Sequence, residues 1–204
     1  MRLLAIETSG EACSAALFSD GELLDARHET IGRGHAERLV PMIGELPARG
    51  RADRILVSLG PGSFTGVRIG LAAGRALGLA WNAEVLGFPT LALIAAMTRS
   101  QGAADVGVCM NGGHGQWFVQ QFDEAGAPGT ALASLPPADA AEYLDGPLIA
   151  GNRASELCEL TAKAVRPLHL IADARGVAAL PESAYLANLA PIYGRAPDAK
   201  VPQG

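Results

Sequence analysis

The feature that most restricts the fold is a series of glycines at every fourth position of one predicted helix. Gly66, Gly70, Gly74 and Gly78 recur at this spacing, and about 100° per residue places them along one slowly drifting stripe. Each glycine inside a helix costs about 1 kcal/mol relative to alanine, so close packing must offset this free energy. A flat glycine ridge lets another backbone approach, either the chain's own sheet or other helix, or a second protein. The stripe alone favours packing within the chain, on its own sheet or its other helix.

Apolar periodicity and turn residues predict an α/β fold around this helix. A meander of three antiparallel strands comes first, and helices alternate with strands after it, so the predicted order of the first half is β-β-β-α-β-α-β-α. The predicted ranges are 3–6, 13–18 and 22–30 for the meander, 35–46 for a helix, 54–59 for a buried strand, a helix to about residue 80, a strand at 84–88 and a helix from about residue 89.

The second half begins as the first half does. An apolar strand over 106–110 is followed by a glycine turn and a further strand. Shifted by 103 residues, Leu3 aligns with Val106 and Gly10 with Gly113. Either a duplicated strand-meander unit or a coincidence between two ordinary hairpins would produce this pattern. We predict two related subdomains, an N-terminal one over residues 1–102 and a smaller one over residues 103–204.

The charge balance argues against a nucleic-acid-binding surface. The 204 residues include 16 basic and 21 acidic side chains, a net charge of −5. A role with nucleic acid would therefore need another protein to supply the positive field. Aromatic residues make up only 5% of the chain, which leaves few platforms on which bases could stack. These numbers disfavour an independent tRNA-binding module.

The cysteines and the apolar runs indicate the compartment. Cys13, Cys109 and Cys158 are odd in number and scattered, which favours buried free thiols over a disulfide or zinc framework. Arg68 and Arg75 interrupt the longest apolar run before it reaches the roughly 18 residues that span a bilayer. The first residues also lack the layout of a signal peptide. We expect a cytoplasmic protein that does not bind a membrane.

A glycine-rich turn, Gly60–Gly70, leads from the buried strand into the glycine-striped helix. Amides at a helix N-terminus can bind phosphate. The turn nevertheless lacks the lysine of a Walker loop and the glycine spacing of a dinucleotide-binding loop. Two interpretations of this turn are equally supported. It is either a tight turn in which Ser63 or a neighbour caps the helix, or a contact site for an anion.

Catalytic and metal-binding constellations are hard to assemble from this sequence. Among the carboxylates, Glu7 alone lies at the end of a strand where a phosphate hydrolase would need an acid, and one acid does not hold magnesium over a polyphosphate. We therefore expect no catalytic residue, no metal ligand and no cofactor of the chain's own. The histidines lack metal-ligand spacing, which favours surface or capping roles for His28, His35, His114 and His169.

Four stretches together resemble a known family. They are residues 6–9, 35–37, 60–70 and 191–195, and they are similar to the bacterial tRNA threonylcarbamoyladenosine-biosynthesis proteins called TsaB or YeaZ, non-catalytic relatives of TsaD. The resemblance covers nearly the whole chain, and the glycine turn with its helix is its most specific part. The chain departs from the family at 111–115, where an Asp-Ala-Arg-like turn is common. A smaller departure is Gly194, where leucine is usual.

The resemblance implies an actin-like ATPase (ASKHA, ribonuclease H-like) fold of two related subdomains, each with a mixed sheet and flanking helices. It implies that the chain binds and activates TsaD through its N-terminal helices, works with the ATPase TsaE, and contacts tRNA only indirectly. ATP and metal would belong to the partner proteins. TsaD holds its metal with a histidine pair, and residues 90–94 take that place here without histidine.

With the resemblance counted, we expect the glycine stripe to lie at an intermolecular surface, in a heterodimer with TsaD or in a homodimer of the isolated chain. The alternative to this non-catalytic role is an enzyme that acts alone, either an actin-like-fold ATPase or kinase or a metallopeptidase-like enzyme. The expected interface residues are His35, Leu39, Gly66, Gly70 and Gly74. The expected anion or nucleotide contacts are Thr8, Ser9 and Gly10.

Overall fold

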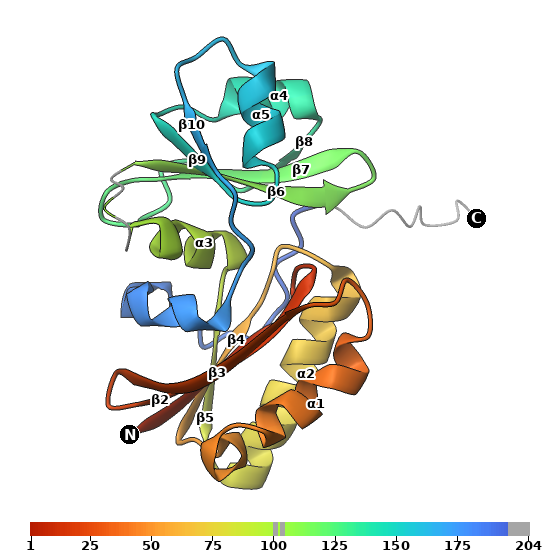
Figure 1. Ribbon diagram of the computed structural model, residues 1–204, viewed down its shortest axis with the longest axis vertical. Helices are drawn as coiled ribbons and strands as arrows, with labels where there is room; N and C mark the ends of the chain where they lie inside the picture. Colours follow the sequence, from red (N-terminus) through yellow and green to blue (C-terminus); the bar gives the residue numbers. More distant parts are fainter. Residues whose placement is uncertain (100–101, 103–104, 196–204) are drawn as a thin grey trace, which may run out of the picture.

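The computed structural model describes residues 1–99, 102 and 105–195. Two five-stranded sheets lie in it, one in each half of the chain (Figure 1). The first sheet has the order β3-β2-β1-β4-β5, in which β1, β2 and β3 are antiparallel neighbours and β4 and β5 run parallel to β1. Its strands are β1 (Arg2–Glu7), β2 (Ala12–Ser19), β3 (Glu22–Thr30), β4 (Arg54–Ser58) and β5 (Glu84–Phe88).

The second sheet repeats the topology of the first. Its order is β8-β7-β6-β9-β10, again an antiparallel meander of three strands followed by two parallel strands. Two ordinary hairpins would share the antiparallel strands but not the two parallel strands that follow, so the common topology extends beyond the hairpins and favours two related halves over a coincidence. The strands are β6 (Val106–Gly113), β7 (Gln116–Phe122), β8 (Ala133–Leu135), β9 (Leu148–Ala150) and β10 (Arg166–Leu168).

The three α-helices of the first half occur in the predicted order, and two further α-helices, whose ranges are not predicted from the sequence, cover the second sheet. Helices α1 and α2 lie side by side on the outer face of the first sheet, and α4 and α5 lie on the outer face of the second (Figure 1). Between the sheets lie α3 and the 3-10 helix η2. The bounds are α1 (His35–Gly44), η1 (Pro47–Gly50), α2 (Phe64–Trp81), α3 (Thr90–Arg99), α4 (Pro137–Tyr143), α5 (Ala154–Leu160), η2 (Ala174–Ala179) and η3 (Glu182–Ala184).

Alternation along β1 shows how the cores are divided. Leu4 and Ile6 pack with residues of α1 and α2, whereas Ala5 belongs to the cluster that α3 and η2 form between the sheets. Strand side chains alternate between the two faces of a sheet, so one strand serves both cores. The middle core takes residues from both sheets, and the two halves therefore share it.

The chain after β10 returns to the first sheet. The amide of Ala174 in η2 donates to the hydroxyl of Ser14 at 3.0 Å. Farther on, Leu186 pairs with Gly87 on the free edge of β5. The boundary that we predict after residue 102 falls beside residues 103–104, which lie outside the described part of the chain.

The glycine stripe of α2 faces this sheet. An added Cβ atom would lie 2.0 Å from the carbonyl oxygen of Thr8 at Gly66, 2.5 Å from the Thr8 hydroxyl oxygen at Gly70, and 2.3 Å from a methyl group of Val85 at Gly78. All the stripe glycines are buried. The expectation of an intermolecular stripe is therefore wrong, because the missing side chains let α2 approach the chain's own strands.

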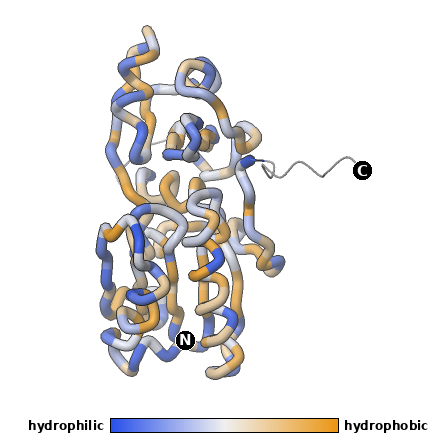
Figure 2. Tube along the Cα trace, turned by 90° about the vertical axis from the view of Figure 1, so that its right-hand side faces the viewer, coloured by the Kyte–Doolittle hydropathy of each residue, from blue (hydrophilic) through white to orange (hydrophobic). Residues whose placement is uncertain are grey.

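Apolar residues follow the central strands and the helix faces that cover them (Figure 2). Of the three cysteines, Cys13 and Cys109 are buried and Cys158 is partly buried, and all three are free thiols. Among the described residues, no helix is long and apolar enough to cross a membrane.

Candidate functional site

A cleft of about 810 Å³ lies between the two halves. Its walls come from loops that follow β1, β4 and β6, the ends at which open α/β sheets place ligand-binding loops. Several wall positions are glycines, so the backbone itself is accessible there. The principal lining residues are 9–11 after β1, 62–64, 67 and 68 at the start of α2, 110–114 at the β6–β7 turn, Asn152 and 192–195.

Phe64, Arg68 and Tyr193 form a stacked group at one edge of the cleft. The guanidinium carbon of Arg68 lies 3.6 Å from the centroid of the Phe64 ring. The rings of Phe64 and Tyr193 are stacked with their centroids 5.7 Å apart, and Arg68 Nη2 donates to the Tyr193 hydroxyl at 3.1 Å. This group joins the C-terminal segment to α2, yet Phe64 remains 55% exposed and Tyr193 50% exposed.

Asn152 ties the two halves together across the cleft. Its Nδ2 donates to Glu11 Oε1 at 3.1 Å, and its Oδ1 accepts from the amide of Asn111 at 2.9 Å. The unusual β6–β7 turn is held on the other side by Arg195, whose Nη2 donates to His114 Nδ1 at 3.2 Å. The glycine-rich turn at 111–115 therefore contributes to one wall of the cleft.

Of the three expected anion contacts, Ser9 and Gly10 line the cleft and Thr8 does not. The Thr8 hydroxyl donates to the carbonyl oxygen of Gly66 at 2.8 Å and is buried beneath α2, so it does not line the cleft. Ser9 and Gly10 do line it, but the Ser9 hydroxyl is engaged in a buried hydrogen bond. Ser63 caps α2 by accepting from the amide of Gly66 at 3.2 Å, which confirms the predicted cap.

Glu7 is sealed behind a chain of buried hydroxyl groups. Its Oε1 accepts from the amide of Ser9 at 2.5 Å and from the Ser9 hydroxyl at 2.6 Å. Because that hydroxyl donates to Glu7, Thr90 must donate to Ser9 over 2.8 Å, and Ser58 to Thr90 over 2.7 Å. Oε2 has no hydrogen-bond partner among the described residues. Burial raises the pKa of Glu7 above 4.5, against the opposing effect of the Ser9 hydrogen bonds.

The free energy of unfolding of the wild-type chain should fall as pH rises, and we expect Glu7→Gln to abolish this fall. The unfolded chain ionises Glu7 near 4.5, whereas the folded chain keeps its proton to higher pH, so the free energy of unfolding falls between these two pKa values. Glutamine keeps the acceptor for Ser9 and does not ionise. Urea unfolding at a series of pH values from 5 to 8 should show the variant gaining stability relative to wild type as pH rises.

The exposed carboxylate of Glu142 on α4 provides the control. Glu142→Gln should leave the pH dependence of stability as it is in the wild-type chain. Equal slopes for the wild-type and Glu7→Gln proteins would contradict the raised pKa of Glu7.

Two histidines take structural roles, and one of them, His35, is buried and does not cap its helix, contrary to the expected surface or capping role. His35 begins α1 and lies buried, with its Nε2 3.1 Å from the carbonyl oxygen of Ala12. His28 Nδ1 lies 3.1 Å from Asp173 Oδ2. The stretch 90–94, in which no histidine occurs, is buried in α3. Within residues 1–99, 102 and 105–195, no cluster of three or more His, Cys, Asp or Glu is arranged to hold a metal ion.

The expected interface residues are all buried within the chain itself. His35 and Leu39 lie on the buried face of α1, and Gly66, Gly70 and Gly74 lie on the buried face of α2. Because these faces pack on the chain's own sheet, the residues are not available to a partner. The expectation that they form the contact surface is therefore corrected.

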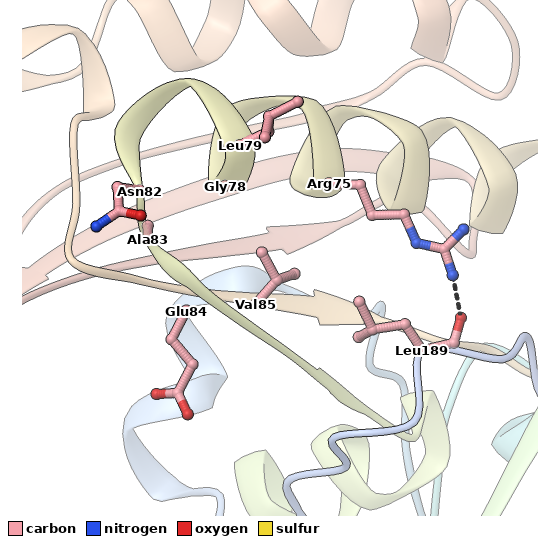
Figure 3. Close-up of a pocket in the computed structure, with 8 residues that line it drawn as sticks. All are labelled: Arg75, Gly78, Leu79, Asn82, Ala83, Glu84, Val85 and Leu189. Carbon is pink, nitrogen blue, oxygen red and sulfur yellow. Dashed lines mark hydrogen bonds between the residues drawn. The ribbon is translucent and has the colours of Figure 1, made fainter.

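The outer faces of these helices carry the exposed residues instead. Val40 on α1 is 57% exposed, and Leu79 on α2, at 88%, is the most exposed large apolar residue of the described chain. Leu79 points away from β5, whereas Arg75 reaches down to the C-terminal segment and donates to the carbonyl oxygen of Leu189 at 3.0 Å (Figure 3). Ala72 and Ala76 lie exposed on the same helix.

The stacked group and the hydrogen bonds of Asn152 across the cleft are not predicted from the sequence. Two signals for the stacked group were present: Phe64 and Arg68 are four residues apart at the start of the helix, and Tyr193 stands in the closing motif. Nothing in the sequence links positions 64 and 193, or 11 and 152, because these contacts depend on how the two halves meet.

Two duplicated halves, each built on a mixed five-stranded sheet of the same order, enclose a cleft between glycine-rich turns. This arrangement defines the class of actin-like ATPase folds. The profile of the TsaD family, described as tRNA N6-adenosine threonylcarbamoyltransferase, matches residues 28–169, more than half of the chain. The chain belongs to the TsaD family, in its TsaB (YeaZ) group.

Solved structures and a sequence relative agree with this assignment. YeaZ from Pseudomonas aeruginosa is 29% identical with a TM-score of 0.80, covering 94% of this chain and 99% of that one. Another Pseudomonas aeruginosa structure, described as similar to peptidase YEAZ, is 30% identical with a TM-score of 0.75, covering 88% of this chain and 89% of that one.

The sequence relative is the tRNA threonylcarbamoyladenosine biosynthesis protein TsaB of Escherichia coli (strain K12). It is 37% identical over 134 residues, which are 62% of this chain. The match spans 58% of that relative's length.

Proposed function

We propose that this chain takes part in the biosynthesis of threonylcarbamoyladenosine in tRNA, as a non-catalytic subunit that binds and activates a TsaD-type enzyme. The observation that carries the proposal is the similarity to a protein named for this pathway, 37% identical over 134 residues. A TsaE-type ATPase completes the proposed complex. ATP and metal belong to the partner proteins, and the chain has no cofactor of its own.

The surroundings of Glu7 support the absence of catalysis. A carboxylate that assists phosphate chemistry must reach the substrate or its metal in the ionised form. Glu7 is fully buried, its Oε1 is taken by Ser9, and burial favours its protonated form. Residues 90–94, where TsaD carries its histidine pair, present buried side chains in α3.

The outer face of α1 and α2 is the surface that we assign to the catalytic partner. It combines exposed apolar side chains, Val40 and Leu79, with the small side chains of Ala72 and Ala76. Small residues on a helix allow another helix to pack closely, and apolar contacts at the centre of an interface supply most of the affinity. The buried glycine ridge contributes indirectly, because it fixes how α2 lies on the sheet.

Reconstitution tests the proposal directly. Purified TsaD-type and TsaE-type partners, tRNA and a threonylcarbamoyl donor should form the modified adenosine only when this chain is added. Modification at the full rate without the chain would overturn the proposal.

Two measurements on the chain alone separate it from an independent enzyme. Calorimetric titration with ATP and Mg²⁺ should show no binding, and elemental analysis should find no stoichiometric zinc or iron. Nucleotide turnover or peptidase activity by the purified chain would favour the enzyme alternative instead.

A further inference from the structure

The exposed aromatic residues of this chain are gathered at one place. The five phenylalanines, three tyrosines and two tryptophans are all described, and only Phe64 and Tyr193 among them are exposed. These two rings stack on each other at the edge of the cleft, with centroids 5.7 Å apart. A low overall aromatic content therefore does not mean that a stacking platform is lacking.

The charge at this edge is opposite to that of the whole chain. Arg68 and Arg195 line the cleft, and Glu11 is the acidic residue among the lining side chains. Glu11 accepts a hydrogen bond from Asn152, while the guanidinium carbon of Arg68 lies over the Phe64 ring, 3.6 Å from its centroid. A guanidinium stacked on an aromatic ring extends the planar surface and adds positive charge to it.

The walls beside the platform are open to close approach. Gly10 and Gly113 line the cleft, and a Cβ atom added at either position would meet no other atom within 4 Å. A volume of about 810 Å³ is in the range that accommodates small planar ligands. Half-exposed rings, an arginine plane and accessible backbone are the elements with which proteins hold unstacked bases of single-stranded nucleic acid.

We propose that this edge of the cleft binds an unstacked base of single-stranded RNA, with the base on the exposed surface of Phe64 and Tyr193 and a neighbouring phosphate beside Arg68. The inference deepens the proposed function, on which it rests, because a complex that modifies tRNA brings an RNA loop close to this chain. It replaces the expectation of only indirect contact with tRNA by a direct contact of one nucleotide.

Fluorescence anisotropy with a labelled single-stranded oligoribonucleotide, at low salt and with the purified full chain, tests the inference. Stacking on one aromatic side chain contributes enough that Phe64→Leu should weaken binding about tenfold. Arg68→Gln should also weaken it. Arg75→Gln is the matched control, since Arg75 is another exposed arginine of α2 that bonds to the C-terminal segment but does not line the cleft.

Three outcomes would overturn the inference. One is binding that Phe64→Leu leaves unchanged in a variant with wild-type unfolding stability. Another is equal binding of a duplex of the same sequence, whose bases cannot leave the stack to reach the rings. The third is binding of adenosine monophosphate without binding of the oligonucleotide, which would assign the cleft to a free nucleotide.

A second measurement needs no variant. Irradiation of the wild-type chain with a 4-thiouridine-containing oligonucleotide should crosslink peptides that contain Phe64 or Tyr193. Crosslinks found only on another surface would contradict the proposed site. If the chain is required for modification and yet fails both tests, the RNA site is wrong and the proposed function stands.

Discussion

Replacing Gly66 by alanine is expected to lower the free energy of unfolding by about 3 kcal/mol or more. The new Cβ atom would lie 2.0 Å from the carbonyl oxygen of Thr8, a backbone atom at the end of β1. A flexible side chain could rotate away from such a contact, but here either α2 or β1 must shift. The shift would also disturb the hydrogen bond from the Thr8 hydroxyl to the Gly66 carbonyl. Urea unfolding followed by circular dichroism measures the loss.

Gly74→Ala provides the internal comparison on the same stripe. Its Cβ atom would lie 3.6 Å from Val57, an ordinary van der Waals distance. Alanine also favours the helix over glycine by about 1 kcal/mol, so this variant should match or exceed the wild-type stability. Equal destabilisation of both variants would contradict the packing of α2 on the sheet. An unchanged stability of the Gly66→Ala variant would contradict it too.

Periodicity and turn residues were sufficient to predict the order of elements in the first half. Each range depends on local signals, such as the apolar run at 54–59 and the glycine turn after it, and the strand over 84–88 has the bounds of β5. The duplication also left a trace in the sequence. The common topology becomes visible only in the strand order of the second sheet, because parallel crossovers place strands side by side that are distant in sequence.

The direction of the glycine stripe could not be read from spacing. Gly66, Gly70, Gly74 and Gly78 define a face of α2, but spacing does not say what packs on that face. The stripe alone favoured packing within the chain, and the family resemblance reversed that interpretation. The contacts of Gly66 with Thr8 and of Gly78 with Val85 show that the first interpretation was correct.

The cleft was only partly predictable for a related reason. The turns that line it were singled out as glycine-rich segments, and Glu7 was recognised as the one acid at a strand end. Its enclosure depends on Ser58 and Thr90, which come from other elements. The stacked group likewise needs Tyr193 to return to α2 from the far end of the chain. Such meetings follow from tertiary packing, which no local pattern encodes.

The second large effect is expected at the outer face of α2. Leu79→Lys should reduce the affinity for the proposed TsaD-type partner at least tenfold, about 1.4 kcal/mol, because the proposed contact would bury a charged ammonium in an apolar surface. The monomer should keep its stability, since Leu79 is 88% exposed and lysine is a good helix former that suits the last turn of a helix. Calorimetric titration of the partner gives the affinity.

Leu160→Lys is the matched control for this prediction. Leu160 also lies in the last turn of a helix, α5, and is 53% exposed, but it belongs to the outer surface of the second half. The same chemical change there should leave partner affinity unaltered, so a general effect of added charge is separated from a local one. If Leu160→Lys abolished binding while Leu79→Lys did not, the partner surface would lie on α4 and α5. The buried glycine ridge would then serve only the fold of the first half.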